Sequence, residues 1–150
     1  MPLVLFAFGG VDKALAHSIN CEEIEVAAVK TCILVEDQAM FLELIHCMLE
    51  PLEGLRIAAH ATTVAEGLQA CEEHRPDIVI LDLGLPDGSG FTVARHAIAT
   101  NPAVKIILLS GQLSDVVCPS WINKHLHAAI SKSDAFQRLR EELGELLPGE

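Results

Sequence analysis

Aromatic side chains and positive charges are both scarce in this sequence of 150 residues. It contains no tyrosine and a single tryptophan, and its 21 acidic residues outnumber its 10 lysines and arginines, for a formal net charge of −11. So acidic a chain does not suit the phosphate backbone of nucleic acids, and no basic stripe or recognition motif is present. We therefore predict that this chain does not bind nucleic acid directly.

Cysteine pairs at metal-binding spacing are also missing. The five cysteines are irregularly spaced, and no CxxC pair occurs. This pattern indicates neither a zinc site nor a disulfide framework, and it favours buried free thiols in a reducing compartment. The closest pair of histidines is His125 and His127, for which we expect a solvated loop, because no third metal ligand follows at a recognised spacing.

Long apolar segments are absent as well. No segment is long enough to cross a bilayer. The apolar start at residues 1–8 lacks the basic region and the small-residue cleavage site of a signal peptide, so we expect a cytoplasmic protein without a membrane partner. We expect residues 1–29 to be an N-terminal extension, with a weakly helical stretch at 11–19. A poorly ordered extension without a role is the preferred interpretation, and an interaction arm is the alternative.

What the sequence does contain is a single domain's length of alternating strand and helix patterns. The apolar run at 78–81 is too short for a helix and rich in β-branched residues, as in strands covered on both faces of a parallel sheet. Alternation of such runs with amphipathic segments implies right-handed crossovers and helices on both faces. The expected strands are 32–35, 55–59, 78–81, 104–109 and 128–131. The expected helices are 38–49, 63–74, 91–100, a short one near 119–125, and a last one that Ser133 caps and that ends near Leu147.

End signals and periodicity give further local predictions. Thr63 and Glu66 form a capping box, in which each side chain accepts a hydrogen bond from the other's backbone N–H. The residue before Pro102 is pushed out of the helical region, so helix 91–100 ends there. Pro119 can stand in the first turn of the short helix, where its missing N–H costs nothing. The inward faces are expected to hold Phe41, Leu44, Ile45 and Met48, then Val64, Leu68 and Cys71, and finally Phe136, Leu139, Leu143 and Leu146.

The stretch at 79–90, VILDLGLPDGSG, resembles the phosphoacceptor segment of bacterial response regulator receiver domains. Further elements of that family follow strands in the expected order, namely Glu36-Asp37, Ser110-Gly111 and Lys132. The resemblance covers residues 30–148, which we expect to be the receiver domain. It implies an α/β fold with a five-stranded parallel sheet of order 2-1-3-4-5 and helices on both faces, the flavodoxin-like receiver fold.

In that order the first and third strands are neighbours, so Glu36, Asp37 and Asp82 converge at one edge of the sheet. Two carboxylates about 4 Å apart repel by roughly 4 kcal/mol at an effective dielectric near 20. Such a cluster takes up protons or binds a cation, and hard oxygen ligands suit Mg²⁺. The expected direct ligands are Asp37, Asp82 and the backbone carbonyl of Gly84, with Glu36 acting through a water.

Asp82 is then the nucleophile that forms an aspartyl phosphate. Catalysis of this transfer consists mostly of positioning and of neutralising the charge on the phosphoryl oxygens. The resemblance implies that the Lys132 ammonium and the Ser110 hydroxyl each contact one such oxygen and that Mg²⁺ takes the third. Asp87 is expected to shape the turn and not to touch the site.

Two positions depart from the family pattern. The family usually has an aromatic residue three positions before its lysine, where this chain has Ala129, and many members have proline directly after the lysine, where it has Ser133. The first departure puts the usual switch in doubt and leaves the phosphoacceptor chemistry intact. Because the last helix ends near Leu147, we expect a standalone receiver that signals through protein contacts.

Three functions compete at this point. The first is a phosphoacceptor that takes its phosphoryl group from a sensor histidine kinase or a phosphotransfer protein and that is no enzyme beyond its own phosphorylation and dephosphorylation; a homodimer is left open. The second is a receiver-fold interaction module that works without phosphorylation. The third is a haloacid-dehalogenase-like phosphatase, which would need a second acid where Gly84 stands and a metal-binding acidic pair after its lysine, not before it.

Overall fold

The computed structural model describes residues 28–148. The predictions for the N-terminal extension, including its helical stretch at 11–19, lie outside the described residues. Within residues 28–148, no helix combines the length and the apolar character that a bilayer crossing requires.

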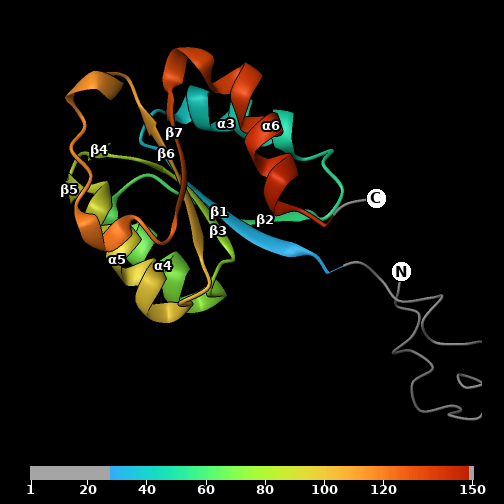
Figure 1. Ribbon diagram of the computed structural model, residues 1–150, viewed down its shortest axis with the longest axis horizontal. Coiled ribbons are helices and arrows are strands. Elements are labelled where there is room, and N and C mark those ends of the chain that lie inside the picture. Colours follow the sequence, from blue (N-terminus) through green and yellow to red (C-terminus); the bar gives the residue numbers. More distant parts are fainter. Residues whose placement is uncertain (1–27, 149–150) are drawn as a thin grey trace, which may run out of the picture.

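A five-stranded parallel sheet runs through the described chain in the order β2-β1-β3-β6-β7 (Figure 1). This confirms the predicted order 2-1-3-4-5, counted over the long strands, and with it the α/β receiver fold. The strands are β1 (Lys30–Val35), β2 (Leu55–Ala61), β3 (Ile78–Asp82), β6 (Lys105–Ser110) and β7 (Leu126–Ser131). The helices that follow them are α3 (Ala39–Leu49), α4 (Val64–His74), α5 (Gly90–Thr100) and α6 (Ala135–Leu146). Directly after β3, a short antiparallel hairpin forms from β4 (Gly84–Leu85) and β5 (Gly88–Ser89).

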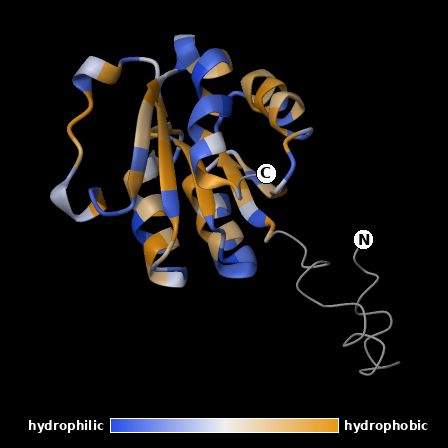
Figure 2. Ribbon diagram, turned by 45° about the vertical axis from the view of Figure 1, so that its right-hand side comes forward, coloured by the Kyte–Doolittle hydropathy of each residue, from blue (hydrophilic) through white to orange (hydrophobic). Residues whose placement is uncertain are grey.

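Two hydrophobic layers lie on opposite faces of the sheet. Along β1, Ile33 and Val35 pack into the layer under α4 and α5, whereas Cys32 and Leu34 pack into the layer under α3 and α6. Both faces of the strands are covered, which explains why each strand is a continuous apolar run in the sequence. Figure 2 shows this as largely orange strands between helices, most of which mix orange with blue.

The inward face of α3 agrees with the prediction in part. Ile45 is buried as predicted, and Phe41 and Met48 are partly buried against the same core. Leu44, however, is 50% exposed, and the other buried residues of this helix are Leu42 and Leu49. The spacing of the buried residues is i, i+3 and i+7, which is the same helical period on a neighbouring stripe. The helix has apolar residues nearly all round, so periodicity alone could not fix which stripe faces the sheet.

The caps of α4 and α6 also depart in part from the prediction. The Thr63 hydroxyl accepts from the backbone N–H of Glu66 at 3.0 Å, as predicted. The Glu66 carboxylate, however, accepts from the backbone N–H of Thr62 at 2.8 Å, not from that of Thr63. Ser133 does not cap the last helix, because a 3-10 turn at Lys132–Asp134 precedes α6. The cap of this 3-10 turn is Ser131, whose hydroxyl accepts from the Ser133 N–H at 3.3 Å.

Between β6 and β7, the segment 111–125 contains less helix than predicted. In place of a helix near 119–125, it has two 3-10 turns, at Leu113–Asp115 and Ser120–Ile122. Pro119 is extended and precedes the second turn, and the chain must reach β7 only a few residues later, which leaves no room for another helical turn. The predicted Trp121 and Ile122 do stand on this turn, and Ile122 is fully buried.

Candidate functional site

Three carboxylates meet at the carboxyl edge of the sheet. Val35, the last residue of β1, is paired with Leu81 of β3, so Glu36 and Asp82 leave the sheet side by side. Carboxylate oxygens of Glu36, Asp37 and Asp82 lie within 4.8 Å of one another. The predicted convergence is therefore present; we call these three residues the acidic rim. It lies at the topological switch point, where ligands of open α/β sheets bind.

Lys132 places its ammonium group against this rim. Its Nζ lies 3.0 Å from Asp82 Oδ2 and 3.0 Å from Glu36 Oε1. The lysine enters from the turn after β7, and its Nζ also lies 5.3 Å from the centre of the Phe41 ring, within the range of a cation–π contact. Burial alone would lower the Lys132 pKa, but the hydrogen bonds from its ammonium to Glu36 and Asp82 outweigh it and raise the pKa. The group is thus held as a cation beside Asp82.

Glu36 is almost fully buried, with 1% of its surface exposed. Burial raises its pKa, and the hydrogen bonds from Lys132 and from the backbone N–H of Gln38 reduce this effect without cancelling it. Both of these hydrogen bonds go to Oε2, at 3.1 and 3.0 Å. Oε1 is buried without a hydrogen bond of acceptable geometry, although Lys132 is close to it. One oxygen of this buried carboxylate therefore still lacks a fully directed partner.

Asp82 stands at the end of β3 with 6% of its surface exposed. Its Oδ1 accepts from the backbone N–H of Gly84 at 3.3 Å. The loop then folds back so tightly that a Cβ on Gly90 would stand 2.4 Å from the Asp82 carbonyl oxygen. A hydrogen bond of 2.9 Å from the Gly90 N–H to the Leu83 carbonyl closes this turn. In the sequence, Gly90 is only the last residue of the stretch VILDLGLPDGSG; the close approach explains why glycine stands there.

Ser110 ends β6, the strand next to β3. Asp82 is paired with Leu109, so Ser110 lies one position further toward the carboxyl edge. Its hydroxyl accepts from the backbone N–H of Gln112 at 3.1 Å. Nothing lies within 4 Å of where a Cβ on Gly111 would be, which leaves space around the residue that follows the hydroxyl. Ser110 is thus at the correct edge, with its hydroxyl engaged by its own turn.

The comparison with known proteins decides the family. A model of the response regulator receiver domain matches residues 32–144. The chain belongs to this family. Receiver domains belong to two-component response regulators, interact with histidine kinases or phosphotransfer proteins, and generally bind Mg²⁺ at an acidic pocket.

Two curated relatives illustrate how receiver domains are used. The probable C4-dicarboxylate response regulator DctR of Priestia megaterium is 28% identical over 117 residues, which are 75% of this chain and 50% of that protein. Protein-glutamate methylesterase/protein-glutamine glutaminase 2 of Nitratidesulfovibrio vulgaris is 33% identical over 78 residues, which are 52% of this chain and 21% of that protein. This receiver chain therefore spans half the length of the first relative and about a fifth of the second.

A solved structure supports the same fold. RcsB from Salmonella enterica serovar Typhimurium, bound to promoter rprA in the presence of phosphomimetic BeF3-, aligns with a TM-score of 0.63 at 19% identity. The alignment covers 78% of this chain and 98% of that one. At this identity the likeness concerns the receiver fold alone.

Asp87 has a different place in this receiver domain from the one predicted. Its carboxylate does not merely shape the turn; it accepts from the first two backbone N–H groups of α4, those of Val64 at 2.6 Å and Ala65 at 3.1 Å. These hydrogen bonds lower the Asp87 pKa. The loop after Asp82 is thereby attached to the start of a helix that precedes it in the chain. No local sequence signal identifies this contact, because its partners are more than twenty residues apart.

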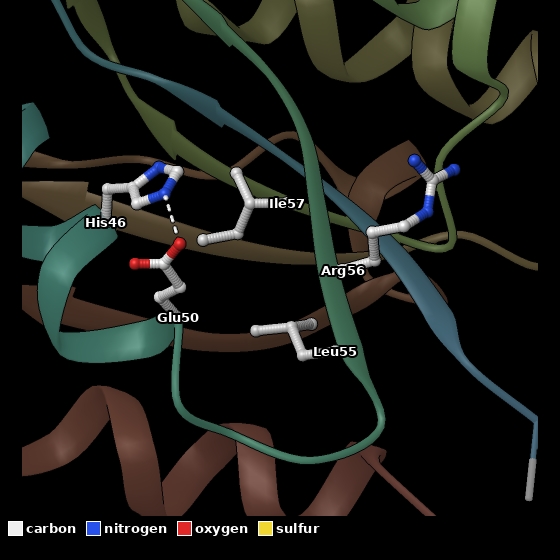
Figure 3. A pocket seen from close by; sticks show the side chains of 5 residues that line it. All are labelled: His46, Glu50, Leu55, Arg56 and Ile57. Atoms are coloured by element: carbon white, nitrogen blue, oxygen red, sulfur yellow. Dashed lines mark ion pairs between the residues drawn. The ribbon is translucent and has the colours of Figure 1, made fainter. Parts of the chain in front are cut away.

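A hollow of about 270 Å³ lies elsewhere on the receiver domain, between α3 and β2. Figure 3 shows its lining, with His46 and Glu50 on the helix side and Leu55, Arg56 and Ile57 on the strand. His46 Nε2 lies 3.8 Å from Glu50 Oε2. The hollow shares no residue with the acidic rim, and it contains none of the predicted phosphoacceptor residues.

Proposed function

We propose that residues 30–148 form a receiver domain that accepts a phosphoryl group on Asp82 from a sensor histidine kinase or a phosphotransfer protein. The observation that carries this proposal is the 3.0 Å contact between Lys132 Nζ and Asp82 Oδ2 at the edge of three converging carboxylates. A cation held beside a nucleophilic carboxylate can neutralise the charge of an incoming phosphoryl group. The receiver then signals through protein contacts, and residues 1–29 form an extension to it.

The acidic rim fits a divalent cation by its charge and its donors. Three carboxyl groups face one ammonium group, so the acidic groups of the rim outnumber the basic one, and the buried Glu36 Oε1 has no well-directed hydrogen bond. Mg²⁺ takes oxygen ligands and keeps several waters. Asp37, Asp82 and the backbone carbonyl of Gly84 would bind it directly and Glu36 through a water. Once bound, Mg²⁺ would offset charge on a phosphoryl oxygen.

The transfer itself requires little covalent work from the protein. An Asp82 carboxylate oxygen forms a bond to phosphorus while the bond from phosphorus to the donor nitrogen or oxygen breaks, and the donor keeps that electron pair. Lys132 releases part of its contact with Asp82 and pairs with a phosphoryl oxygen. Ser110 exchanges its hydrogen bond with Gln112 for one that its hydroxyl donates to another phosphoryl oxygen. In this proposal the chain itself makes no direct contact with nucleic acid, in keeping with the net charge of −11.

Labelling distinguishes this function from that of an interaction module working without phosphorylation. Ala129, at the position where the family usually has an aromatic residue, is the feature that favours such a module. Incubation of the full chain with Mg²⁺ and acetyl phosphate should add the mass of one phosphoryl group, read by intact mass spectrometry. If the chain stays unlabelled with acetyl phosphate, with phosphoramidate and with a phosphorylated phosphotransfer protein, the interaction module is supported instead.

Asp37→Ala should weaken Mg²⁺ binding by at least about 10-fold. Loss of a residue that only supports the ligands of a metal ion already has an effect of this size. The substitution removes a carboxylate of the acidic rim without disturbing the core, because Asp37 is exposed. In metal-free buffer the variant should be no less stable than the parent, since repulsion within the rim falls. Titration of Mg²⁺ against both proteins measures this. Glu43→Ala, an exposed acid on α3, is the matched control, and equal Mg²⁺ affinity of the Asp37 variant and the parent would refute the ligand assignment.

Trp121 should report the response to phosphorylation. Its ring lies edge-on to Phe91 with centroids 6.2 Å apart, and the Arg95 guanidinium lies 4.5 Å from its centroid. Since Ala129 has no alternative rotamer, we expect the segment 111–125 to move when Ser110 turns to the phosphoryl group. Emission from Trp121, the single tryptophan, should change on addition of Mg²⁺ and beryllofluoride.

The emission change should vanish in Asp82→Asn and weaken in Ser110→Ala. Hydrogen exchange of the segment 111–125 provides a second measurement that does not depend on the ring environment. Confirmed beryllofluoride binding with unchanged emission and unchanged exchange in this segment would show that the response leaves the site by another route.

A further inference from the structure

A second group of metal-binding side chains lies away from the acidic rim. His127, near the start of β7, faces Glu142 and Glu145, which stand on α6 with i, i+3 spacing. The ligand atoms of all three lie within 4.8 Å of one another. His127 precedes Lys132 by five residues of mostly extended chain, which is on the order of 16 Å. We call these three residues the His-Glu cluster.

Two distances within the cluster match those between ligands of one tetrahedral ion. His127 Nε2 lies 3.2 Å from Glu142 Oε1 and 3.3 Å from Glu145 Oε1. Zinc binds nitrogen and carboxylate oxygen at about 2.0–2.2 Å in a tetrahedron, so two of its ligand atoms stand roughly 3.3–3.5 Å apart. Both nitrogen–oxygen separations are therefore within a few tenths of an ångström of a tetrahedral edge.

Hydrogen bonding does not account for this arrangement. His127 Nε2 is buried, and neither carboxylate is placed to form a hydrogen bond with it in acceptable geometry, despite the short distances. A metal ion bound to an imidazole nitrogen lies along the direction of that nitrogen's lone pair. The other ligands of the ion are therefore displaced to the sides of this direction. The unpartnered nitrogen flanked by two oxygens thus points to an ion and not to a simple histidine–carboxylate hydrogen bond.

The surroundings leave the cluster accessible and hold one of its ligands in place. The Arg138 guanidinium donates to Glu142 Oε2 at 2.8 Å, which fixes that carboxylate and leaves its Oε1 toward His127. The Glu145 side chain is 67% exposed, whereas those of His127 and Glu142 are 17% and 18% exposed. An ion can therefore enter on the Glu145 side, where a water molecule can complete its coordination.

We propose that His127, Glu142 and Glu145 bind Zn²⁺, with water as the fourth ligand. One imidazole and two carboxylates suit this ion, whereas the all-oxygen acidic rim suits Mg²⁺. Bound zinc would tie the carboxyl-terminal half of α6 to β7. The structure contradicts the predicted solvated loop at His125 and His127: His127 lies on β7, and His125 is buried with its Nδ1 3.2 Å from the Val104 carbonyl oxygen.

Zinc titration of the full chain tests this site. The chain is stripped with a chelator, dialysed, and titrated with zinc chloride by calorimetry in excess Mg²⁺, which occupies the acidic rim. One equivalent should bind to the parent. His127→Gln and Glu145→Gln should each weaken zinc binding by more than roughly 10- to 100-fold. That range is the cost of losing a residue that only supports the ligands, and here a ligand itself is lost. His96→Gln is the matched control, because His96 pairs with a single carboxylate, Glu72, at 2.6 Å, and it should bind zinc as the parent does.

Cobalt provides an independent measurement that also identifies the ligands. Co²⁺ bound to the parent should give the visible absorption of a tetrahedral nitrogen and oxygen site, and this absorption should be lost in Glu145→Gln, whose exposed side chain is not needed for folding. Zinc should also raise the melting temperature of the parent and not that of this variant. The proposal is overturned if the parent binds no zinc, if both variants bind it as the parent does, or if Co²⁺ shows the near-ultraviolet bands of thiolate ligands in its place.

Discussion

Asp82→Asn should abolish phosphoryl labelling of the chain. An amide has no negatively charged oxygen to attack phosphorus, and it also removes one of the three carboxylates of the acidic rim. The parent should gain one phosphoryl group with Mg²⁺ and a small-molecule donor, whereas the variant should gain none over the same period. Intact mass spectrometry under non-acidic, cold conditions measures both, because an aspartyl phosphate hydrolyses readily.

The control for this experiment is Asp115→Asn. Asp115 is an exposed aspartate outside the acidic rim, so this variant should be labelled as the parent is. Circular dichroism of the Asp82 variant should match that of the parent, since the exchange is nearly isosteric. Labelling of Asp82→Asn at the parent's level would place the phosphoryl group on another residue and end the proposal for Asp82.

Gly90→Ala should destabilise the fold by roughly 1–3 kcal/mol or more, as overpacking of a close contact does. Its Cβ would stand 2.4 Å from the Asp82 carbonyl oxygen and 3.0 Å from Leu83 Cα. These are backbone atoms at the end of the central strand, and they cannot turn aside as a flexible side chain would. Denaturant unfolding measures the loss, and the folded fraction of the variant should also be labelled more slowly because Asp82 is displaced.

Gly144→Ala is the matched control for this loss of stability. Gly144 lies within α6, and nothing stands within 4 Å of where its Cβ would be. Alanine should therefore stabilise the chain there, by about 0.5–1 kcal/mol, through its higher helix propensity. If the two alanine variants unfold at the same denaturant concentration, the tight turn at Gly90 is not the constraint that its geometry indicates.

The strands could be predicted from the sequence because each is an apolar run between clear turn signals. Ile78 to Leu81 are all buried on both faces of the sheet, so no choice of face arose there. In α3 that choice did arise, and Leu44 was wrongly assigned to the inward face because Leu42 and Leu44 are equally apolar and only the packed sheet distinguishes them. The short helix near Pro119 was wrong for a similar reason: the length available before β7, and not the local sequence, limited it.

The site was predictable to the extent that it depends on strand ends. Asp82 ends a strand, Glu36 and Lys132 each directly follow one, and the strand order brings those ends together. The direct contact between Lys132 and Glu36 was not predicted, because it depends on how far a long side chain reaches between groups 96 residues apart in sequence. The attachment of Asp87 to α4 was not predicted for a similar reason, since no periodic pattern in the sequence indicates a contact between a loop and the start of a distant helix.

That attachment makes the surroundings of Asp82 unequal in stiffness. On one side, Asp87 fastens the phosphoacceptor loop to α4, and Gly90 lies directly against the end of β3. On the other side, Gly111 has open space about it, and the chain beyond holds only short 3-10 turns. We therefore expect a new bond at Asp82 to displace the chain on the second side more than on the first. The response of this domain should then be directional, with α4 as the fixed support and the segment 111–125 as the part that moves.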